Sequence, residues 1–141
     1  MQSGTTLSEH PRVLLVDDNV DMLDTAAAAL SSGFEIVGAV KDGRTALEAA
    51  DRLQPDVIVL DISMPGMGGL EVAKRLKVAG STAAVVFLTI HDDEEVVRAA
   101  KDAGGLGYVL KPRLVSELPQ ATLEASEGRR FISTRLPSSL W

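Results

Sequence analysis

Short apolar runs alternate with helix-like patterns along most of the chain, and this alternation constrains the fold more than any other feature. The runs are rich in β-branched residues, as buried strands are. Between them, apolar residues recur three or four positions apart, as on one face of an amphipathic helix. The expected strands are residues 13–16, 34–40, 57–60, 84–88 and 107–110. Strands that alternate with helices predict an α/β fold with a parallel sheet covered by helices on both faces.

Five helices are expected after the five strands. Glycines mark two of the helix ends, at Gly33 and at Gly104-Gly105. Ser116 is the expected N-cap of the last helix, with Pro119 in the first turn, where proline is tolerated. Residues 1–10 are polar and without pattern, so we expect a flexible N-terminal tail.

Composition excludes several classes of protein. The chain of 141 residues fits one domain, and it contains no cysteine, which rules out disulfides and thiolate metal sites and favours a reducing cytoplasm. A net charge of −6 makes this chain alone a poor binder of nucleic acid. No apolar run approaches the roughly 20 residues needed to cross a bilayer, and the N-terminus lacks the pattern of a secretory signal.

Polar residues follow four of the expected strands. Asp17-Asp18 follow the first, Asp61 the third, Thr89 the fourth and Lys111 the fifth. In doubly wound sheets the carboxyl ends of the strands form the binding site. Converging carboxylates repel one another unless a cation intervenes, and oxygen ligands suit a hard ion such as Mg²⁺. This pattern indicates phosphoryl transfer to an aspartate, with the lysine and the hydroxyl neutralising the phosphoryl oxygens.

Each of these residues also has an ordinary structural explanation. Asp18 or Asn19 would serve as a helix cap, and Asp61 as a turn residue. Thr89 would cap the fourth helix, and Lys111 would be a surface lysine with a buried stem. These explanations account for the residues singly, but they do not account for the joint occurrence at four strand ends.

Four segments, VLLVDDN, VIVLDISMPGMGGLE, VVFLTI and GYVLKP, resemble the receiver domain of two-component response regulators. The resemblance spans residues 12–128 and implies a flavodoxin-like sheet of strand order 2-1-3-4-5. It implies that Asp61 is the phosphoacceptor and that Asp17 and Asp18, with Asp61, bind Mg²⁺ or Mn²⁺. It assigns Thr89 as the switch hydroxyl and Lys111 as the invariant lysine.

The same resemblance assigns further roles. Tyr108 is the switch aromatic, the backbone carbonyl of Ser63 is a metal ligand, and the Lys111-Pro112 peptide bond is cis. The positions of Ser63 and His91 tune hydrolysis of the phosphoryl group in the family. The residue after Thr89 is usually small, so the bulky Ile90 is expected to hinder access to that group.

The end of the chain, AGGLGYVLKPRLVSELPQATLEASEGRRFIS, resembles receivers of the LuxR/FixJ (NarL) type. We therefore expect a receiver over residues 11–128 and, over 129–141, the start of a linker to an absent helix-turn-helix domain that would bind DNA. The resemblance implies a sensor histidine kinase as phosphodonor, control of transcription, and a homodimer on phosphorylation. It implies a signalling protein, without a membrane partner, that catalyses only its own phosphorylation and dephosphorylation.

Two alternatives stay open on the sequence. The chain could be a stand-alone receiver, either a phosphorelay intermediate or a module that works without phosphate. A small phosphatase with an aspartate nucleophile is the other alternative. That class usually carries an acidic residue two positions after the nucleophile, where this chain has Ser63, and it tends to need a cap for which 141 residues leave little room.

Overall fold

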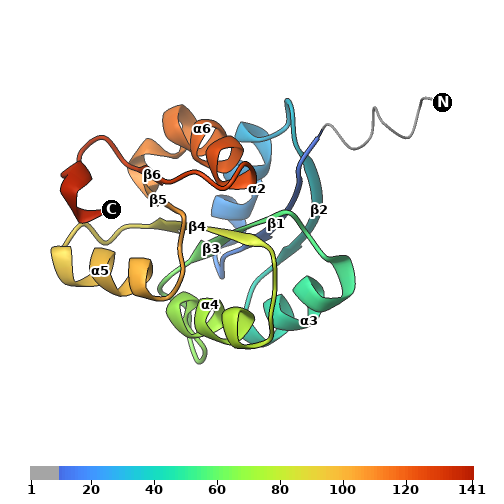
Figure 1. Ribbon diagram of the computed structural model, residues 1–141. Coiled ribbons are helices and arrows are strands. Elements are labelled where there is room, and N and C mark those ends of the chain that lie inside the picture. Colours follow the sequence, from blue (N-terminus) through green and yellow to red (C-terminus); the bar gives the residue numbers. More distant parts are fainter. Residues whose placement is uncertain (1–9) are drawn as a thin grey trace.

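A parallel sheet of six strands forms the centre of the fold (Figure 1). The computed structural model describes residues 10–141, so nine of the ten residues of the predicted tail lie outside the described residues. The strands are β1 (Arg12–Val16), β2 (Glu35–Val40), β3 (Val57–Asp61), β4 (Ala84–Thr89), β5 (Gly107–Leu110) and β6 (Phe131–Ile132). Their order is β2-β1-β3-β4-β5-β6, and all neighbours run parallel. The predicted order of the first five strands is confirmed, and β6 extends it.

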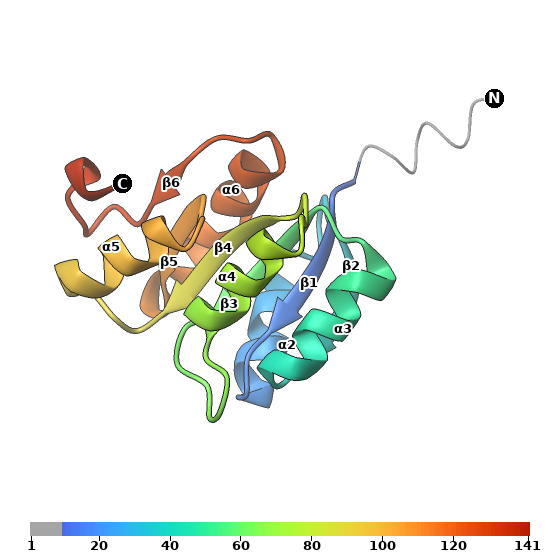
Figure 2. The same ribbon diagram turned by 60° about the horizontal axis from the view of Figure 1, so that its bottom comes forward.

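Within the described residues, five α-helices cover the two faces of this sheet, as predicted. They are α2 (Val20–Ala29), α3 (Gly43–Leu53), α4 (Gly69–Val78), α5 (Glu94–Asp102) and α6 (Leu114–Ser126). In Figure 1, α2 and α6 lie above the sheet and α3, α4 and α5 lie below it, and Figure 2 shows the same layers from a second direction. Within residues 10–141, no helix has the length and apolar character that a bilayer crossing requires.

Alternating side chains of the strands divide the core into two halves. In β1, Val13 and Leu15 pack on the side of α2 and α6, whereas Leu14 and Val16 pack on the side of α3, α4 and α5. The other central strands follow the same period of two. Because both faces are buried, these strands are apolar throughout. Each fully buried Val or Leu contributes about 1.5–3 kcal/mol to the free energy of unfolding.

The start of the last helix differs from the prediction. A short 3₁₀ turn, Lys111–Arg113, leads directly into α6 at Leu114, so Ser116 is not the N-cap. Its hydroxyl instead donates to the carbonyl of Arg113 at 3.3 Å. Pro119 consequently lies in the second turn of the helix, where its missing N–H leaves one i→i−4 hydrogen bond unmade.

The expected cis bond between Lys111 and Pro112 is a second correction. No peptide bond within residues 10–141 is cis, so the Lys111-Pro112 bond is trans. Pro112 stands at the start of the 3₁₀ turn. There its fixed φ suits the helical backbone and its missing N–H costs no hydrogen bond. The trans form is also the ordinary preference of a bond that precedes proline.

The fold continues past the predicted boundary at residue 128. After α6 the chain returns along the sheet, and Phe131 and Ile132 pair with Gly107 and Tyr108 of β5. A final 3₁₀ turn, η2 (Ser138–Leu140), lies next to α5. The predicted linker segment, residues 129–141, therefore contributes a strand and apolar contacts to the domain.

Candidate functional site

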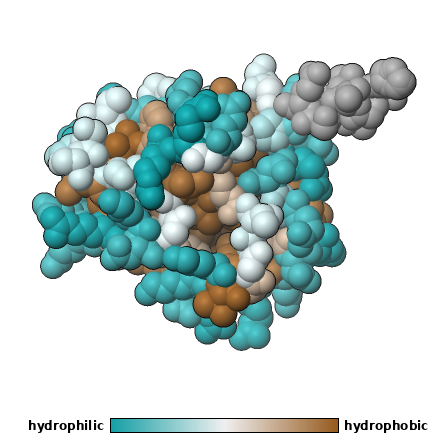
Figure 3. Space-filling model, viewed as in Figure 1, coloured by the Kyte–Doolittle hydropathy of each residue, from teal (hydrophilic) through white to brown (hydrophobic). Residues whose placement is uncertain are grey.

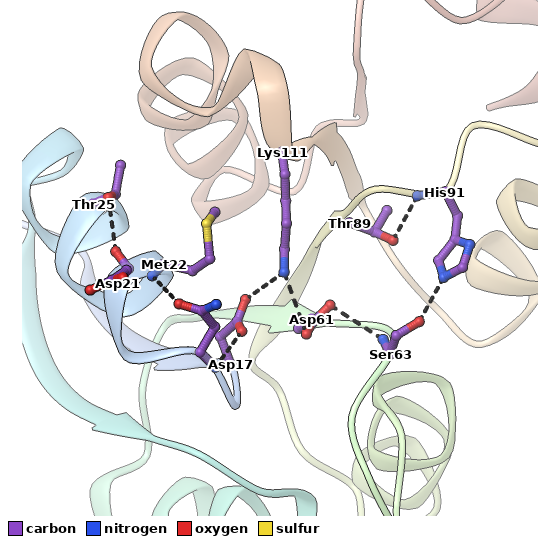
Figure 4. A network of polar contacts seen from close by, with 10 residues as sticks. Asp17, Asp21, Met22, Thr25, Asp61, Ser63, Thr89, His91 and Lys111 are labelled. Carbon is purple, nitrogen blue, oxygen red and sulfur yellow. Dashed lines mark hydrogen bonds and ion pairs between the residues drawn. The ribbon is translucent and has the colours of Figure 1, made fainter.

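The carboxyl edge of the sheet gathers the polar residues that the sequence places after the strands. Asp17 directly follows β1, Asp61 ends β3, Thr89 ends β4 and Lys111 directly follows β5. Figure 4 shows Lys111 reaching down between Asp17 and Asp61, with Thr89 on the neighbouring strand. The structure thus brings together four side chains that lie up to 94 residues apart in the chain, from Asp17 to Lys111.

Local hydrogen bonds in the loop after β1 hold Asp17 and the start of α2. The N–H of Asn19 donates to Asp17 Oδ1 at 2.9 Å, and Asn19 Oδ1 accepts from the N–H of Met22 at 3.1 Å. Asn19 is therefore the cap of α2, one of the two alternatives left by the sequence. This arrangement buries Asp17 and leaves Asp18 exposed at the surface.

Lys111 is the cation of the site. Its Nζ lies 2.9 Å from Asp17 Oδ2 and 3.5 Å from Asp61 Oδ2, and only 16% of its side chain is exposed. The contact with Asp17 Oδ2 is an ion pair without hydrogen-bond geometry, and within residues 10–141 that buried oxygen has no hydrogen-bond partner. One ammonium faces three carboxylates, so the cluster keeps an excess of negative charge.

The excess negative charge and burial together change the pKa of the Asp61 carboxyl. The residue is only 4% exposed. Burial, and then the neighbouring charge of Asp17, raise the pKa of the Asp61 carboxyl to about 6 against the opposing effects of Lys111 and of the Ser63 N–H. That N–H donates to Asp61 Oδ1 at 3.2 Å. A further cation beside Asp61 would favour the carboxylate and lower this pKa.

Three carboxylates form a cluster that fits a metal ion. Asp17, Asp18 and Asp61 each place one oxygen within 4.8 Å of the others. The oxygen of Asp17 without a hydrogen bond and the raised pKa of Asp61 both favour an added cation. Oxygen-only ligands match Mg²⁺ or Mn²⁺ rather than a soft metal.

Gly69 makes room for the acidic loop. The N–H of Gly69 donates to the carbonyl of Ile62 at 2.9 Å, which brings the start of α4 against the end of β3. A Cβ atom at residue 69 would lie 2.1 Å from the carbonyl oxygen of Asp61. Only glycine permits this close approach, so Gly69, the last glycine of the MPGMGG segment, has a direct structural role.

Thr89 and His91 form the far side of the site. Thr89 is fully buried, and its Oγ1 accepts from the N–H of His91 at 3.1 Å. It does not cap α5, which begins at Glu94 after Asp93. His91 Nε2 lies 2.6 Å from Ser63 Oγ, as Figure 4 shows. Ile90, between Thr89 and His91 in the chain, is 69% exposed.

Tyr108 is fully buried and connects this loop to the end of the chain. Its hydroxyl donates to the carbonyl oxygen of His91 at 2.7 Å. Burial raises the pKa of the Tyr108 hydroxyl above its ordinary value, and the charges of Asp93 and Asp92 add to the effect. The ring lies 5.6 Å from that of Trp141, centroid to centroid, at an interplanar angle of 57°.

Besides Asp17 and Asp61, the structure buries a third carboxylate, Glu117 of α6, which no sequence pattern indicates. Its oxygens accept hydrogen bonds from Ser133 and Thr134, which follow β6. The partners are 16 and 17 residues away and meet only because β6 pairs with β5. No local pattern encodes that pairing. The single Trp of the chain, within the predicted linker segment, is the one local signal of a packed C-terminus.

A cavity of about 560 Å³ lies away from the carboxylates. Leu47 and Gln54 from the α3 side and Leu76 and Ser81 from the α4 side line it, together with neighbouring residues. Figure 3 also shows apolar residues gathered around a hollow near the middle of the face seen there. None of the carboxylates of the cluster lines this cavity, so the candidate site is defined by its charges and not by a deep pocket.

Fold and site together define a receiver-type α/β domain, and comparisons with known proteins agree. The family model described as the response regulator receiver domain matches residues 13–123. The chain is 36% identical over 127 residues to the nitrate/nitrite response regulator protein NarP of Escherichia coli, covering 89% of this chain and 59% of NarP. It is 33% identical over 132 residues to the response regulator GacA of Pseudomonas viridiflava, covering 92% of this chain and 61% of GacA.

Solved structures give the same result. The receiver domain of the putative response regulator NarL from Mycobacterium tuberculosis is similar with a TM-score of 0.82 at 33% identity, over 86% of this chain and 99% of that one. A LuxR-family response regulator from Aurantimonas gives a TM-score of 0.86 at 28% identity, over 90% and 92% of the two chains. The chain therefore belongs to the response regulator receiver family. The resemblance to LuxR/FixJ-type receivers is confirmed, and the chain spans about three-fifths of the length of the curated relatives it matches.

Proposed function

We propose that Asp61 accepts a phosphoryl group from the phosphohistidine of a sensor histidine kinase. A carboxylate oxygen of Asp61 forms a bond to phosphorus, the bond from phosphorus to the histidine nitrogen breaks, and that nitrogen takes up a proton. The observation that carries the proposal is the buried carboxylate of Asp61, whose negative charge Lys111 balances only in part and which lies beside two further carboxylates. Its pKa of about 6 keeps it ionised, and so nucleophilic, at neutral pH.

The other residues of the cluster bind and stabilise. Asp17, Asp18, Asp61 and the backbone carbonyl of Ser63 would hold Mg²⁺ or Mn²⁺. The metal, when bound, supplies positive charge next to the phosphoryl oxygens. Lys111 Nζ, 3.5 Å from Asp61 Oδ2, supplies a second positive charge to the same oxygens. Thr89 supplies a hydroxyl donor.

The switch would begin at Thr89 and Tyr108. A phosphorylated Asp61 gains up to about two negative charges and new acceptor oxygens. The hydroxyl of Thr89 turns toward these oxygens, and Tyr108 responds through the carbonyl of His91 that it bonds. Ser63, Ile90 and His91 surround the phosphoryl position and set the lifetime of the phosphorylated state, through access of water and the contact between Ser63 and His91.

The relatives support a role in transcription. The chain is 34% identical over 122 residues to the transcriptional regulatory protein PdtaR of Mycobacterium tuberculosis, of which it covers 59%. We propose a cytoplasmic regulator that dimerises on phosphorylation and reaches DNA only through a C-terminal helix-turn-helix domain. Its chemistry is its own phosphorylation and dephosphorylation, not turnover of an external substrate.

Intact-mass measurement tests the proposal. The chain is incubated with acetyl phosphate and Mg²⁺, and a mass increase of one phosphoryl group is expected. Asp61→Asn should abolish the increase, whereas Asp51→Asn, an identical change at an exposed position of α3, should retain it. No increase in the wild-type chain, or an increase that survives Asp61→Asn, contradicts the assignment. Multiple turnover of p-nitrophenyl phosphate would favour the phosphatase alternative instead.

A further inference from the structure

We propose that the segment Phe131–Trp141, called here the C-terminal strap, reports the state of Asp61, and that phosphorylation releases its Trp141 end while its β6 end stays attached. The inference rests on the proposed function of Asp61. It concerns contacts outside the phosphoacceptor cluster, at the edge of the sheet where β6 pairs with β5 (Figure 1).

Backbone bonds attach the β6 end to β5. The N–H of Phe131 donates to the carbonyl of Leu106 at 3.0 Å, and the N–H of Ser133 donates to the carbonyl of Tyr108 at 2.8 Å. The hydroxyl of Ser133 accepts from the N–H of Leu110 at 3.0 Å. These bonds involve main-chain groups of the strand, so they do not depend on the rotamer of Tyr108.

Glu117 fixes the same end to α6. Its carboxylate accepts from the hydroxyl of Ser133 and from both the N–H and the hydroxyl of Thr134, the last two at 3.2 Å and 2.8 Å. Arg113 Nε lies 3.4 Å away and adds a charge-assisted bond. Detaching the β6 end would break these hydrogen bonds to a buried charge, which has a large cost in free energy. The β6 end is therefore anchored on two elements.

The Trp141 end is held differently. Its indole N–H donates to the carbonyl of Leu106 at 2.6 Å, and its ring packs against the ring of Tyr108. Leu136 and Leu140 pack with Trp141 on the core beside α5. One side-chain hydrogen bond and apolar contacts hold this end. Trp141 packs on the side chain of Tyr108, so a movement of the Tyr108 ring changes the contacts of Trp141 and not the backbone hydrogen bonds of β6.

A series of contacts leads from Thr89, which ends the strand paired with that of Asp61, to the Tyr108 ring beneath Trp141. Thr89 Oγ1 accepts from the N–H of His91, and the carbonyl of His91 accepts from the hydroxyl of Tyr108. A rotation of Thr89 toward a phosphoryl oxygen breaks the first bond and frees the backbone of His91. Tyr108 then loses its fixed acceptor, and the ring beneath Trp141 moves. A local charge change thereby biases a packed element that has two arrangements.

The test uses the single tryptophan of the chain, Trp141. Intact mass and acrylamide quenching of tryptophan fluorescence are measured on the same sample with acetyl phosphate and Mg²⁺. The quenching constant per phosphorylated molecule should rise about twofold, as expected for a locally opened segment. A mass increase without a change in quenching overturns this inference and leaves the phosphoacceptor intact. Absence of a mass increase overturns the proposed function, and this inference with it.

Tyr108→Phe separates coupling from simple packing. The variant keeps the ring beneath Trp141 but lacks the hydroxyl that bonds His91. Because the variant lacks the bond that fixes the ring, quenching before phosphorylation should already be raised toward the value of the phosphorylated wild-type chain. The further rise per phosphorylated molecule should fall by at least about half, because the link to the phosphoryl group is cut. A full rise in this variant contradicts the route through His91.

Amide hydrogen exchange tests the anchored end. The amides of Phe131 and Ser133, which donate to the carbonyls of Leu106 and Tyr108, should exchange at unchanged rates on phosphorylation. The amide of Glu35 at the opposite edge of the sheet, which donates to the carbonyl of Pro11, should also be unchanged. An acceleration of about tenfold at Phe131 and Ser133 would mean that the whole strap leaves the sheet. That outcome contradicts the proposal that only the Trp141 end opens.

Discussion

Asp61 and Glu117 are two carboxylates of nearly equal burial, 4% and 6% exposed, with opposite electrostatic surroundings. Burial disfavours the charge of Glu117, but hydrogen bonds from Ser133, Thr134 and Arg113 outweigh it, and the pKa of Glu117 lies below its ordinary value. For Asp61, burial and Asp17 outweigh Lys111 and one N–H, and the pKa rises to about 6. A buried carboxylate with enough donors stabilises the fold, whereas one that lacks them is ready to bind a cation or to attack an electrophile.

Removal of the charge of Lys111, the one cation beside Asp17 and Asp61 among residues 10–141, should have the largest effect. Lys111→Met keeps most of the length of the side chain but removes the charge that lies between Asp17 and Asp61. We expect the rate of phosphorylation by acetyl phosphate with Mg²⁺ to fall about 10²–10³-fold, the usual cost of losing one electrostatic contact to a transition state. Time-resolved intact mass gives this rate. Lys74→Met, at an exposed position of α4, is the control. Equal rates in the two variants would show that Lys111 has no role in phosphorylation.

Neutralisation of Asp61 should stabilise the fold. Asp61→Asn removes the charge whose pKa is raised by about two units, so the free energy of unfolding at pH 8 without metal should rise by about 2–3 kcal/mol. Urea unfolding with the midpoint and slope both fitted measures it. An unchanged or lower free energy would mean that the charge of Asp61 is already balanced.

The pH dependence of this gain has a definite sign. The folded pKa of about 6 lies above the ordinary 3.8, so the folded state binds more protons between these values. The wild-type chain therefore becomes more stable, relative to Asp61→Asn, as the pH falls from about 6 to about 4. The advantage of the variant is full above pH 7 and shrinks below pH 6. An advantage that grows on acidification contradicts the raised pKa.

Glu117→Gln should act in the opposite direction. The amide keeps one acceptor oxygen but places a donor NH₂ against the groups that donate to Glu117, so the free energy of unfolding at pH 7 should fall by about 1–3 kcal/mol. Because the folded pKa is lowered, the stability that Glu117 contributes is present above its ordinary value of 4.5 and is lost as the pH falls through its folded pKa. Urea unfolding at pH 7 and pH 4 distinguishes the two effects. Stabilisation at pH 7 would place Glu117 in the same class as Asp61.

Added metal should balance part of the charge around Asp61 and stabilise the fold by less than the substitutions above change its stability. At a Mg²⁺ concentration about ten times its Kd, the free energy of unfolding should rise by about 1.4 kcal/mol. The rise should disappear in Asp18→Asn, which removes one of the three clustered carboxylates, and persist in Asp51→Asn. Thermal or urea unfolding with and without Mg²⁺ measures it. An equal rise in all three chains would indicate binding elsewhere.

The alternation of strands and helices predicted the fold because parallel strands covered on both faces must be apolar throughout. The same logic placed Asp17, Asp61, Thr89 and Lys111 at one edge, since each directly follows or ends a strand. These predictions needed only local pattern and the rule that carboxyl ends of parallel strands meet.

What the sequence did not reveal depends on contacts between distant segments. Strand β6 has only two residues, too few for a period to be recognised. The anchoring of Ser133 by Glu117 requires the pairing of β6 with β5. The trans bond before Pro112 departs from what the resemblance implied, and a 3₁₀ turn that fits a trans proline accounts for it. The opposite pKa shifts of Asp61 and Glu117 follow from their donors, which only the structure provides.

Chemical identification of the phosphorylated residue tests the central claim most directly. The chain is phosphorylated with acetyl phosphate and Mg²⁺, reduced with borohydride, digested and sequenced by mass spectrometry, so that an aspartyl phosphate is read as homoserine. Homoserine is expected at position 61 alone, and only in the phosphorylated sample. Homoserine at position 17 or 18, with none at position 61, would contradict the assignment of Asp61 as the phosphoacceptor.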